Sequence, residues 1–191
     1  MRKFFGISSV LLLFSAFAAA QVPTSGNVFV GYSYFNADLT STGAGRHNTN
    51  GWEGSFEGKV FPFIGIVADF SDHYGSGLPI ACPVVPVGGG GIGGGCPLNS
   101  GFNERNILFG PRVSMSVGKF RPFAEALFGA GHINLDSGGT DTSFATAIGG
   151  GLDVKIIRPV AWRFQGDYVQ TRFFDGTQNN VRISTGIVLR F

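Results

Sequence analysis

The sequence predicts an all-β protein, an eight-stranded antiparallel up-and-down transmembrane β-barrel. Apolar side chains alternate with small or charged ones, with a period of two, in eight separate segments. Charged residues make up only 14% of the chain, against about 25% in an ordinary soluble domain. After residue 20, no apolar run approaches the ~20 residues that a membrane-spanning helix requires. An apolar chain of this kind is expected to cross a membrane with strands.

The first segment of the chain has the features of a secretory signal peptide. Arg2 and Lys3 are basic, residues 7–17 are apolar, and three alanines precede Gln21. We expect residues 1–20 to be removed and residues 21–191 to form the barrel. An uncleaved anchor is disfavoured because the apolar run is short. Without Arg2 and Lys3 the 12 acidic residues are matched by equally many basic ones, so the charge indicates no nucleic-acid partner.

The first four alternating segments are Val28 to Phe35, Trp52 to Val60, Ile64 to Ser71 and Asn106 to Met115. In each of them one face collects aromatic and branched side chains, which favours extended backbone. The apolar members are, in order, Val28, Val30 and Tyr32; Trp52, Phe56 and Val60; Ile64, Ile66 and Phe70; and Ile107, Phe109 and Val113.

The second four segments are Ala124 to Gly131, Ser143 to Val154, Trp162 to Thr171 and Asn180 to Phe191. The same alternation continues in them. Their apolar faces carry Ala124, Ala126 and Phe128; Phe144, Ile148 and Leu152; Trp162, Phe164 and Tyr168; and Val181, Ile183 and Ile187. The last segment must pair with the first, because lipid leaves no free strand edge solvated.

The connections alternate in length. Tight links are expected at 61–62, 117–120 and 156–159, and longer polar stretches at 38–49, 73–103, 133–142 and 172–179. Bacterial outer-membrane barrels have short turns on the periplasmic side and longer loops outside. The pattern therefore predicts that both termini of the barrel lie in the periplasm.

The second face of the segments predicts an ionic interior. Six acidic and five basic side chains share this face with small residues: Glu53, Glu57, Lys59, Asp69, Arg112, Glu125, Asp153, Arg163, Asp167, Arg182 and Arg190. A Lys or Arg facing lipid at mid-depth would cost about 2–4 kcal/mol. Because eight strands enclose a space that side chains just fill, we expect a paired network that plugs the lumen. A narrow porin is one alternative, and a soluble lipocalin-like barrel is another.

Aromatic residues gather where segments meet connections. They are expected to form two belts at the membrane interfaces, one with Phe61, Phe63, Phe120, Phe123, Trp162 and Phe191, and the other with Tyr34, Trp52, Tyr74, Phe102 and Phe173.

The sequence resembles the OmpA-like outer-membrane β-barrel family of Gram-negative bacteria. The resemblance covers residues 21–191 and lies in VFVGYSYFNA (28–37), ILFGPRVSMS (107–116) and the closing GIVLRF (186–191). It implies an outer-membrane location, contact with outer-membrane lipids and lipopolysaccharide, and Phe191 as the aromatic signal read by the barrel-assembly machinery. The sequence has no following peptidoglycan-binding domain, so the resemblance does not imply a wall-tethering role.

Cys82 and Cys96 lie in the longest connection. Two neighbouring cysteines in an exported chain favour a disulfide over free thiols or metal ligands. Between them, Gly88, Gly90 and Gly93 match the GxGxxG pattern of dinucleotide sites. That pattern needs a strand and a helix around it, and the segment offers neither, so a loop closed by a cystine is the better interpretation.

Three histidines and two aspartates are candidates for catalysis or cation binding. His47, His73 and His132 stand near the long connections, and His132 with Ser137 could serve a lipid A-modifying enzyme of the outer membrane. Asp136 and Asp141 could bind cations. Solvated side chains at the rim explain the three histidines and the two aspartates more simply. We expect no enzyme, cofactor or metal site, but a monomeric barrel with a structural or surface-interaction role whose surface ligand the sequence does not specify.

Overall fold

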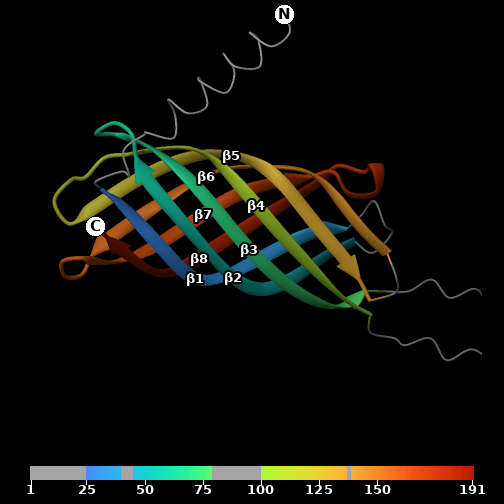
Figure 1. Cartoon of the computed structure of the whole chain (residues 1–191). Helices are drawn as coiled ribbons and strands as arrows, with labels where there is room; N and C mark the ends of the chain where they lie inside the picture. Colours follow the sequence, from blue (N-terminus) through green and yellow to red (C-terminus); the bar gives the residue numbers. More distant parts are fainter. Residues whose placement is uncertain (1–24, 40–44, 79–99, 137–138) are drawn as a thin grey trace, which may run out of the picture.

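The computed structural model describes residues 25–39, 45–78, 100–136 and 139–191. In these residues eight strands close into an antiparallel barrel in chain order (Figure 1). The strands are β1 (Gly26–Leu39), β2 (Gly45–Lys59), β3 (Ile64–Leu78), β4 (Ser100–Ser114), β5 (Phe120–Leu135), β6 (Gly139–Lys155), β7 (Val160–Thr171) and β8 (Gln178–Arg190), with a short 3₁₀ helix η2 (Phe173–Asp175) before β8. The fold class predicted from the sequence is confirmed.

The first and last strands join. β1 pairs with β8 from Asn27 opposite Arg190 to Asn36 opposite Val181. Beyond this ladder, the Gly26 amide donates to the Phe191 carbonyl at 3.0 Å and the Phe191 amide donates to the Gly26 carbonyl at 3.1 Å. The terminal strand therefore has partners on both edges, as a closed sheet in lipid requires.

The two faces of the wall differ in polarity. Apolar side chains on the outer face are solvent-exposed, for example Val30, Phe109, Ile148 and Ile183. The inner face buries acids, arginines, serines and amides. A soluble barrel has the reverse arrangement, so the wall is that of a transmembrane barrel. Among the described residues, no helix has the length and apolarity that crossing a membrane requires.

The strands are longer at one end than the sequence predicts. β1 and β2 stay paired up to Leu39 opposite Gly45, and β5 and β6 up to Leu135 opposite Gly139. The predicted strict alternation of short and long connections is wrong, because only residues 136–138 separate β5 from β6. The backbone ladder continues past the apolar band with polar side chains, where hydrophobic alternation no longer marks it.

The barrel has two distinct ends. The short-turn end carries residues 60–63, 115–119 and 156–159, and β1 begins and β8 finishes there (Figure 1, left). The opposite end is called the long-loop end. The predicted signal peptide 1–20, Cys82, Cys96, the glycines of the GxGxxG pattern and Ser137 all lie outside the described residues.

Candidate functional site: the charged lumen

Two arginines share one carboxylate near the short-turn end. Arg112 of β4 donates from Nε to Glu125 Oε2 at 2.6 Å and from Nη1 to Glu57 Oε2 at 3.2 Å. Arg121 of β5 donates from Nη2 to Glu57 Oε1 at 2.6 Å. Asn27 Nδ2 also donates to Glu57, at 2.8 Å. Both oxygens of Glu57 are thus occupied by donors from three other strands.

A second pair lies beside the first. Arg163 of β7 holds Asp153 of β6 in a bidentate contact, with Nε to Oδ1 at 2.7 Å and Nη2 to Oδ2 at 3.2 Å. Arg190 donates to Asp153 Oδ2 at 3.3 Å, and Arg121 Nη1 lies 3.8 Å from the same oxygen. Bidentate pairs of this kind fix geometry as well as charge.

One aromatic ring, that of Phe123, contacts both Arg112 and Arg163. The guanidinium carbon of Arg112 lies 4.4 Å from the centroid of the Phe123 ring, and that of Arg163 lies 4.6 Å from it. Arg163 also lies over Phe29, at 4.9 Å. Each guanidinium thus gains a cation–π contact with the same buried ring.

Arg182 of β8 is surrounded by three carboxylates in the middle of the lumen. It reaches Asp69 Oδ1 at 2.8 Å, Asp167 Oδ2 at 2.8 Å and Glu53 Oε2 at 3.3 Å. β3, the strand of Asp69, is not a neighbour of β8 in the barrel. The contact to Asp69 therefore crosses the interior and ties opposite parts of the wall together.

Gln165 connects the two groups. Its Nε2 lies 3.0 Å from Glu53 Oε1, 3.0 Å from Glu125 Oε1 and 2.9 Å from Asp167 Oδ2. Ser184 Oγ donates to Glu53 and lies 3.0 Å from Ser33 Oγ, and Ser33 Oγ lies 2.9 Å from His73 Nε2. A continuous polar network therefore runs from Arg190 at the short-turn end to His73.

On the long-loop side of this network, the lumen contains a cluster of apolar side chains. Phe35, whose ring stacks on His73 at 4.6 Å, belongs to a buried cluster with Phe102, Ile133 and Phe173. Phe102, Phe123 and Phe173 were predicted to lie in the interfacial belts, and this is wrong, because all three are buried inside. Phe102 and Phe123 have the parity of the inward face of their strands, and the clustering of aromatics outweighed that parity in the prediction, whereas Phe173 lies in η2. Seven of the remaining predicted belt residues are exposed: Phe61, Phe63, Phe120, Trp162, Phe191, Trp52 and Tyr74.

The structure brings most of the predicted lumen residues into the network. Glu53, Glu57, Asp69, Arg112, Glu125, Asp153, Arg163, Asp167 and Arg182 are buried, and Arg190 joins them while partly exposed. Lys59 instead turns to its own hairpin, where Nζ donates to the Pro62 carbonyl at 3.1 Å.

The predicted set lacked several members of the network, among them Arg121, Asn27 and Gln165. It also lacked Glu104, a buried carboxylate that accepts from Asn106 at 3.3 Å. Arg121 stands four residues before Glu125, so the period of two already placed it on the inner face.

The histidines do not form one site. His73 is inside the barrel, whereas His132 Nδ1 lies 2.7 Å from Thr142 Oγ1 at an exposed position. Asp136 accepts the Gly101 amide at 3.1 Å and Asp141 accepts the Phe174 amide at 2.6 Å, so each carboxylate holds neighbouring backbone. Within the described ranges, no three His, Cys, Asp or Glu side chains gather in a way that could hold a metal ion.

Comparison with known proteins finds relatives in structure alone. No family model matches the sequence, and no curated protein matches it. Neisserial surface protein A superposes with a TM-score of 0.65 at 10% identity, covering 87% of this chain and 97% of that one. Ail, the attachment invasion locus protein of Yersinia pestis, gives 0.56 at 14% identity, with 87% and 98% covered. The N-terminal barrel of Pseudomonas aeruginosa OprF gives 0.51 at 12% identity, with 87% and 99% covered. The chain has the fold of these barrels.

Proposed function

We propose that this protein is an integral bacterial outer-membrane barrel with a structural or surface-interaction role and no catalytic activity. In this proposal the short-turn end and both barrel termini lie in the periplasm, and the long-loop end faces the outside. The apolar outer wall supports membrane insertion. Among proteins of the same fold, one is named a surface protein and another an attachment protein.

The main observation behind a non-conducting role is the occupied interior. Arg112, Arg163 and Arg182 are fully buried and bonded to carboxylates of other strands. Separating a buried ion pair leaves an uncompensated charge that costs about 3–5 kcal/mol. An ion crossing the barrel would have to separate several such pairs, and it would also meet the apolar cluster around Phe35 and Phe102.

The long-loop end offers a rigid polar surface. Arg46 of β2 donates to Asn36 Oδ1 at 2.6 Å and to the Asn179 carbonyl at 3.0 Å, and Asn36 donates to Asn48 at 2.6 Å. On the next pair of strands, Tyr168 donates to Asn179 Oδ1 at 2.7 Å. Exposed amides and a guanidinium held by strands form a preordered surface for a polar partner.

Conductance separates this proposal from a porin. The refolded protein is added to a planar bilayer beside an open porin as positive control. We expect membrane insertion without steady single-channel steps. A reproducible ohmic conductance in the wild-type protein would contradict the sealed barrel.

A replacement of residues 79–99 by a short Gly-Ser linker separates the surface role from the structural role. The deletion strain is complemented with the wild-type or the linker variant, and adhesion and envelope permeability are measured. A surface-interaction role predicts that the linker variant reaches the membrane, restores permeability and fails in adhesion. If both proteins restore both properties, the longest connection carries no interaction.

The mass of lipid A tests the enzymatic alternative. We expect the same lipid A mass in cells with and without expression of the protein, and a changed mass would support the enzymatic alternative.

A further inference from the structure

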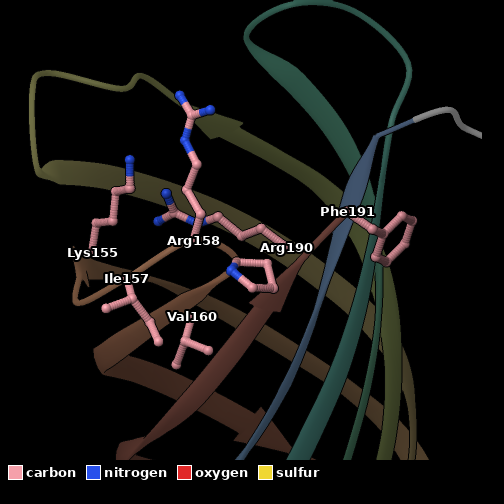
Figure 2. Close-up of a pocket in the computed structure, with 7 residues that line it drawn as sticks. Lys155, Ile157, Arg158, Val160, Arg190 and Phe191 are labelled. Atoms are coloured by element: carbon pink, nitrogen blue, oxygen red, sulfur yellow. The ribbon is translucent and has the colours of Figure 1, made fainter.

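A cavity of about 300 Å³ opens at the short-turn end. It lies between the β6–β7 turn and the end of β8, and Lys155, Arg158 and Arg190 contribute its basic lining. Figure 2 shows the Lys155 and Arg158 side chains reaching beyond the ends of the strands, while Ile157 and Val160 point back along the wall. One site thus has a cationic rim and an apolar side.

Two of the three cations at the rim have no ion-pair partner among the described residues. Arg190 is bonded to Asp153, which is buried and already held by Arg163. In the part of the chain that the structure describes, neither Lys155 nor Arg158 takes part in an ion pair. The turn from Lys155 to Val160 contains no acidic residue. An anion entering the cavity would therefore meet two free positive charges and part of a third.

The apolar side of the cavity is continuous with the outer wall. Ile157 is an apolar residue of the β6–β7 turn, and 63% of its surface is exposed. The neighbouring outward side chains are Val160 on β7 and Leu189 on β8. Exposed branched side chains in a turn are costly in water. They are accommodated if the turn lies among lipid headgroups, with its apolar side chains directed to the acyl region.

The other two short turns have the same composition. Residues 60–63 place Val60, Phe61 and Phe63 beside Lys59, and residues 115–119 place Met115 and Val117 beside Lys119. Neither turn contains an acidic residue. The combination of basic and apolar side chains is thus a property of the whole short-turn end, and at the β6–β7 turn it also encloses a cavity.

We propose that this cavity binds an anionic phospholipid of the periplasmic leaflet, with the phosphate at Lys155 and Arg158 and an acyl chain along Ile157 and Val160. The proposal rests on the membrane placement proposed above. A phosphate headgroup matches the charge of the rim, and the acyl chain matches its apolar side. Basic residues near a membrane surface each favour anionic lipid by roughly fivefold.

Tryptophan quenching tests the proposal, because the chain has only two tryptophans. Trp162 faces outward two residues from Val160 on the same strand, near the cavity. In a Trp52→Phe protein, Trp162 therefore reports on lipid at the short-turn end. The protein is reconstituted into two kinds of phosphatidylcholine vesicle. One contains phosphatidylglycerol brominated near the headgroup, and the other contains the same fraction of phosphatidylcholine brominated at the same position.

We expect stronger quenching by brominated phosphatidylglycerol than by brominated phosphatidylcholine. Lys155→Ala and Arg158→Ala should each lower the relative binding constant about fivefold, and salt should weaken the preference. Arg172→Ala, which removes an exposed charge at the opposite end, is the matched control and should leave the preference unchanged. Heat-modifiability on gels confirms that each variant is folded.

Three results would overturn the lipid site. Equal quenching by both lipids in the Trp52→Phe protein excludes a preference. An unchanged preference in Lys155→Ala and Arg158→Ala places the lipid-binding site elsewhere. Loss of the preference on adding inorganic phosphate, when sodium chloride at the same ionic strength leaves the preference in place, identifies a site for soluble anions. If neither lipid quenches Trp162, the protein has not inserted, and this result contradicts the proposed membrane function as well.

Discussion

Gly31 of β1 and Gly186 of β8 face each other where the barrel closes. A Cβ built on Gly186 would lie 2.3 Å from the Gly31 Cα and 2.3 Å from the Val30 carbonyl oxygen. A Cβ on Gly31 would lie 2.4 Å from the Thr185 carbonyl oxygen. No side chain fits on either residue without moving backbone, so the two glycines permit the close approach of the first and last strands.

Gly186→Ala is therefore expected to weaken closure of the barrel. The methyl group must displace β1, and overpacking of this kind costs about 1–3 kcal/mol. Urea titration of the refolded protein in detergent, followed by heat-modifiability on gels, measures the loss. Gly166→Ala on β7 is the control, because a Cβ there meets no atom within 4 Å. Equal stability of the two variants would show that the seam tolerates a wider spacing.

Arg182→Met is expected to destabilise the barrel by about 3–5 kcal/mol, because the change leaves three buried carboxylates without their shared cation. Glu53, Asp69 and Asp167 all lie within 3.3 Å of the guanidinium nitrogens. The measurement is the free energy of unfolding from urea titration at neutral pH.

Arg46→Met provides the comparison for Arg182→Met. Arg46 Nη2 lies 3.8 Å from Asp38 Oδ2, and the Arg46 side chain is 50% exposed. The free energy of unfolding should therefore fall by less than about 1 kcal/mol. Adding Glu53→Gln to Arg182→Met should restore part of the stability by removing one of the unpaired charges. If this double variant is no more stable than Arg182→Met, electrostatic imbalance is not the cause.

The parity of charged residues made most of the lumen predictable from sequence. Glu125, Asp153 and Arg163 alternate with apolar residues, and lipid would penalise the opposite register by several kcal/mol. Spacing does not reveal partners, however. Arg182 finds Asp69 across the barrel, at a sequence separation of 113 residues, and only barrel closure sets that distance.

Aromatic residues at strand ends were less predictable. Phe120 and Phe123 are close in sequence, yet Phe120 is 53% exposed and Phe123 is 7% exposed. Phe123 contacts Arg112 and Arg163 inside, an environment that a count of apolar residues does not anticipate. The strand ends at the long-loop end were missed for a related reason, since their backbone pairing continues where the side chains are polar on both faces.

Phe123→Ala should lower stability far more than Phe120→Ala. Truncating a buried Phe costs about 3–5 kcal/mol, and here the cation–π contacts of two arginines are lost as well. Phe120 faces outward, where lipid or detergent can occupy the vacated space. Urea titration of both variants in the same detergent gives the comparison. Equal losses would contradict the inward orientation of Phe123.

Phe191→Ala is expected to separate assembly in cells from stability in vitro. The Phe191 ring is 56% exposed and its centroid lies 6.0 Å from that of Phe56, so its packing contributes little to the fold. Its backbone bonds to Gly26 do not depend on the side chain. If Phe191 is the signal for the assembly machinery, the variant should accumulate several-fold less in the outer membrane, yet refold normally from urea into detergent.

Phe63→Ala is the matched control for Phe191→Ala. Phe63 lies at the same end of the barrel with a similar exposure of 58%, but it stands outside the last strand. Normal amounts of both variants in the outer membrane would contradict a signal at Phe191. A Phe191→Ala protein that also fails to refold in detergent would instead assign the residue to stability, since no assembly machinery is present there. Only the combination of poor assembly in cells with normal refolding supports recognition of the terminal aromatic.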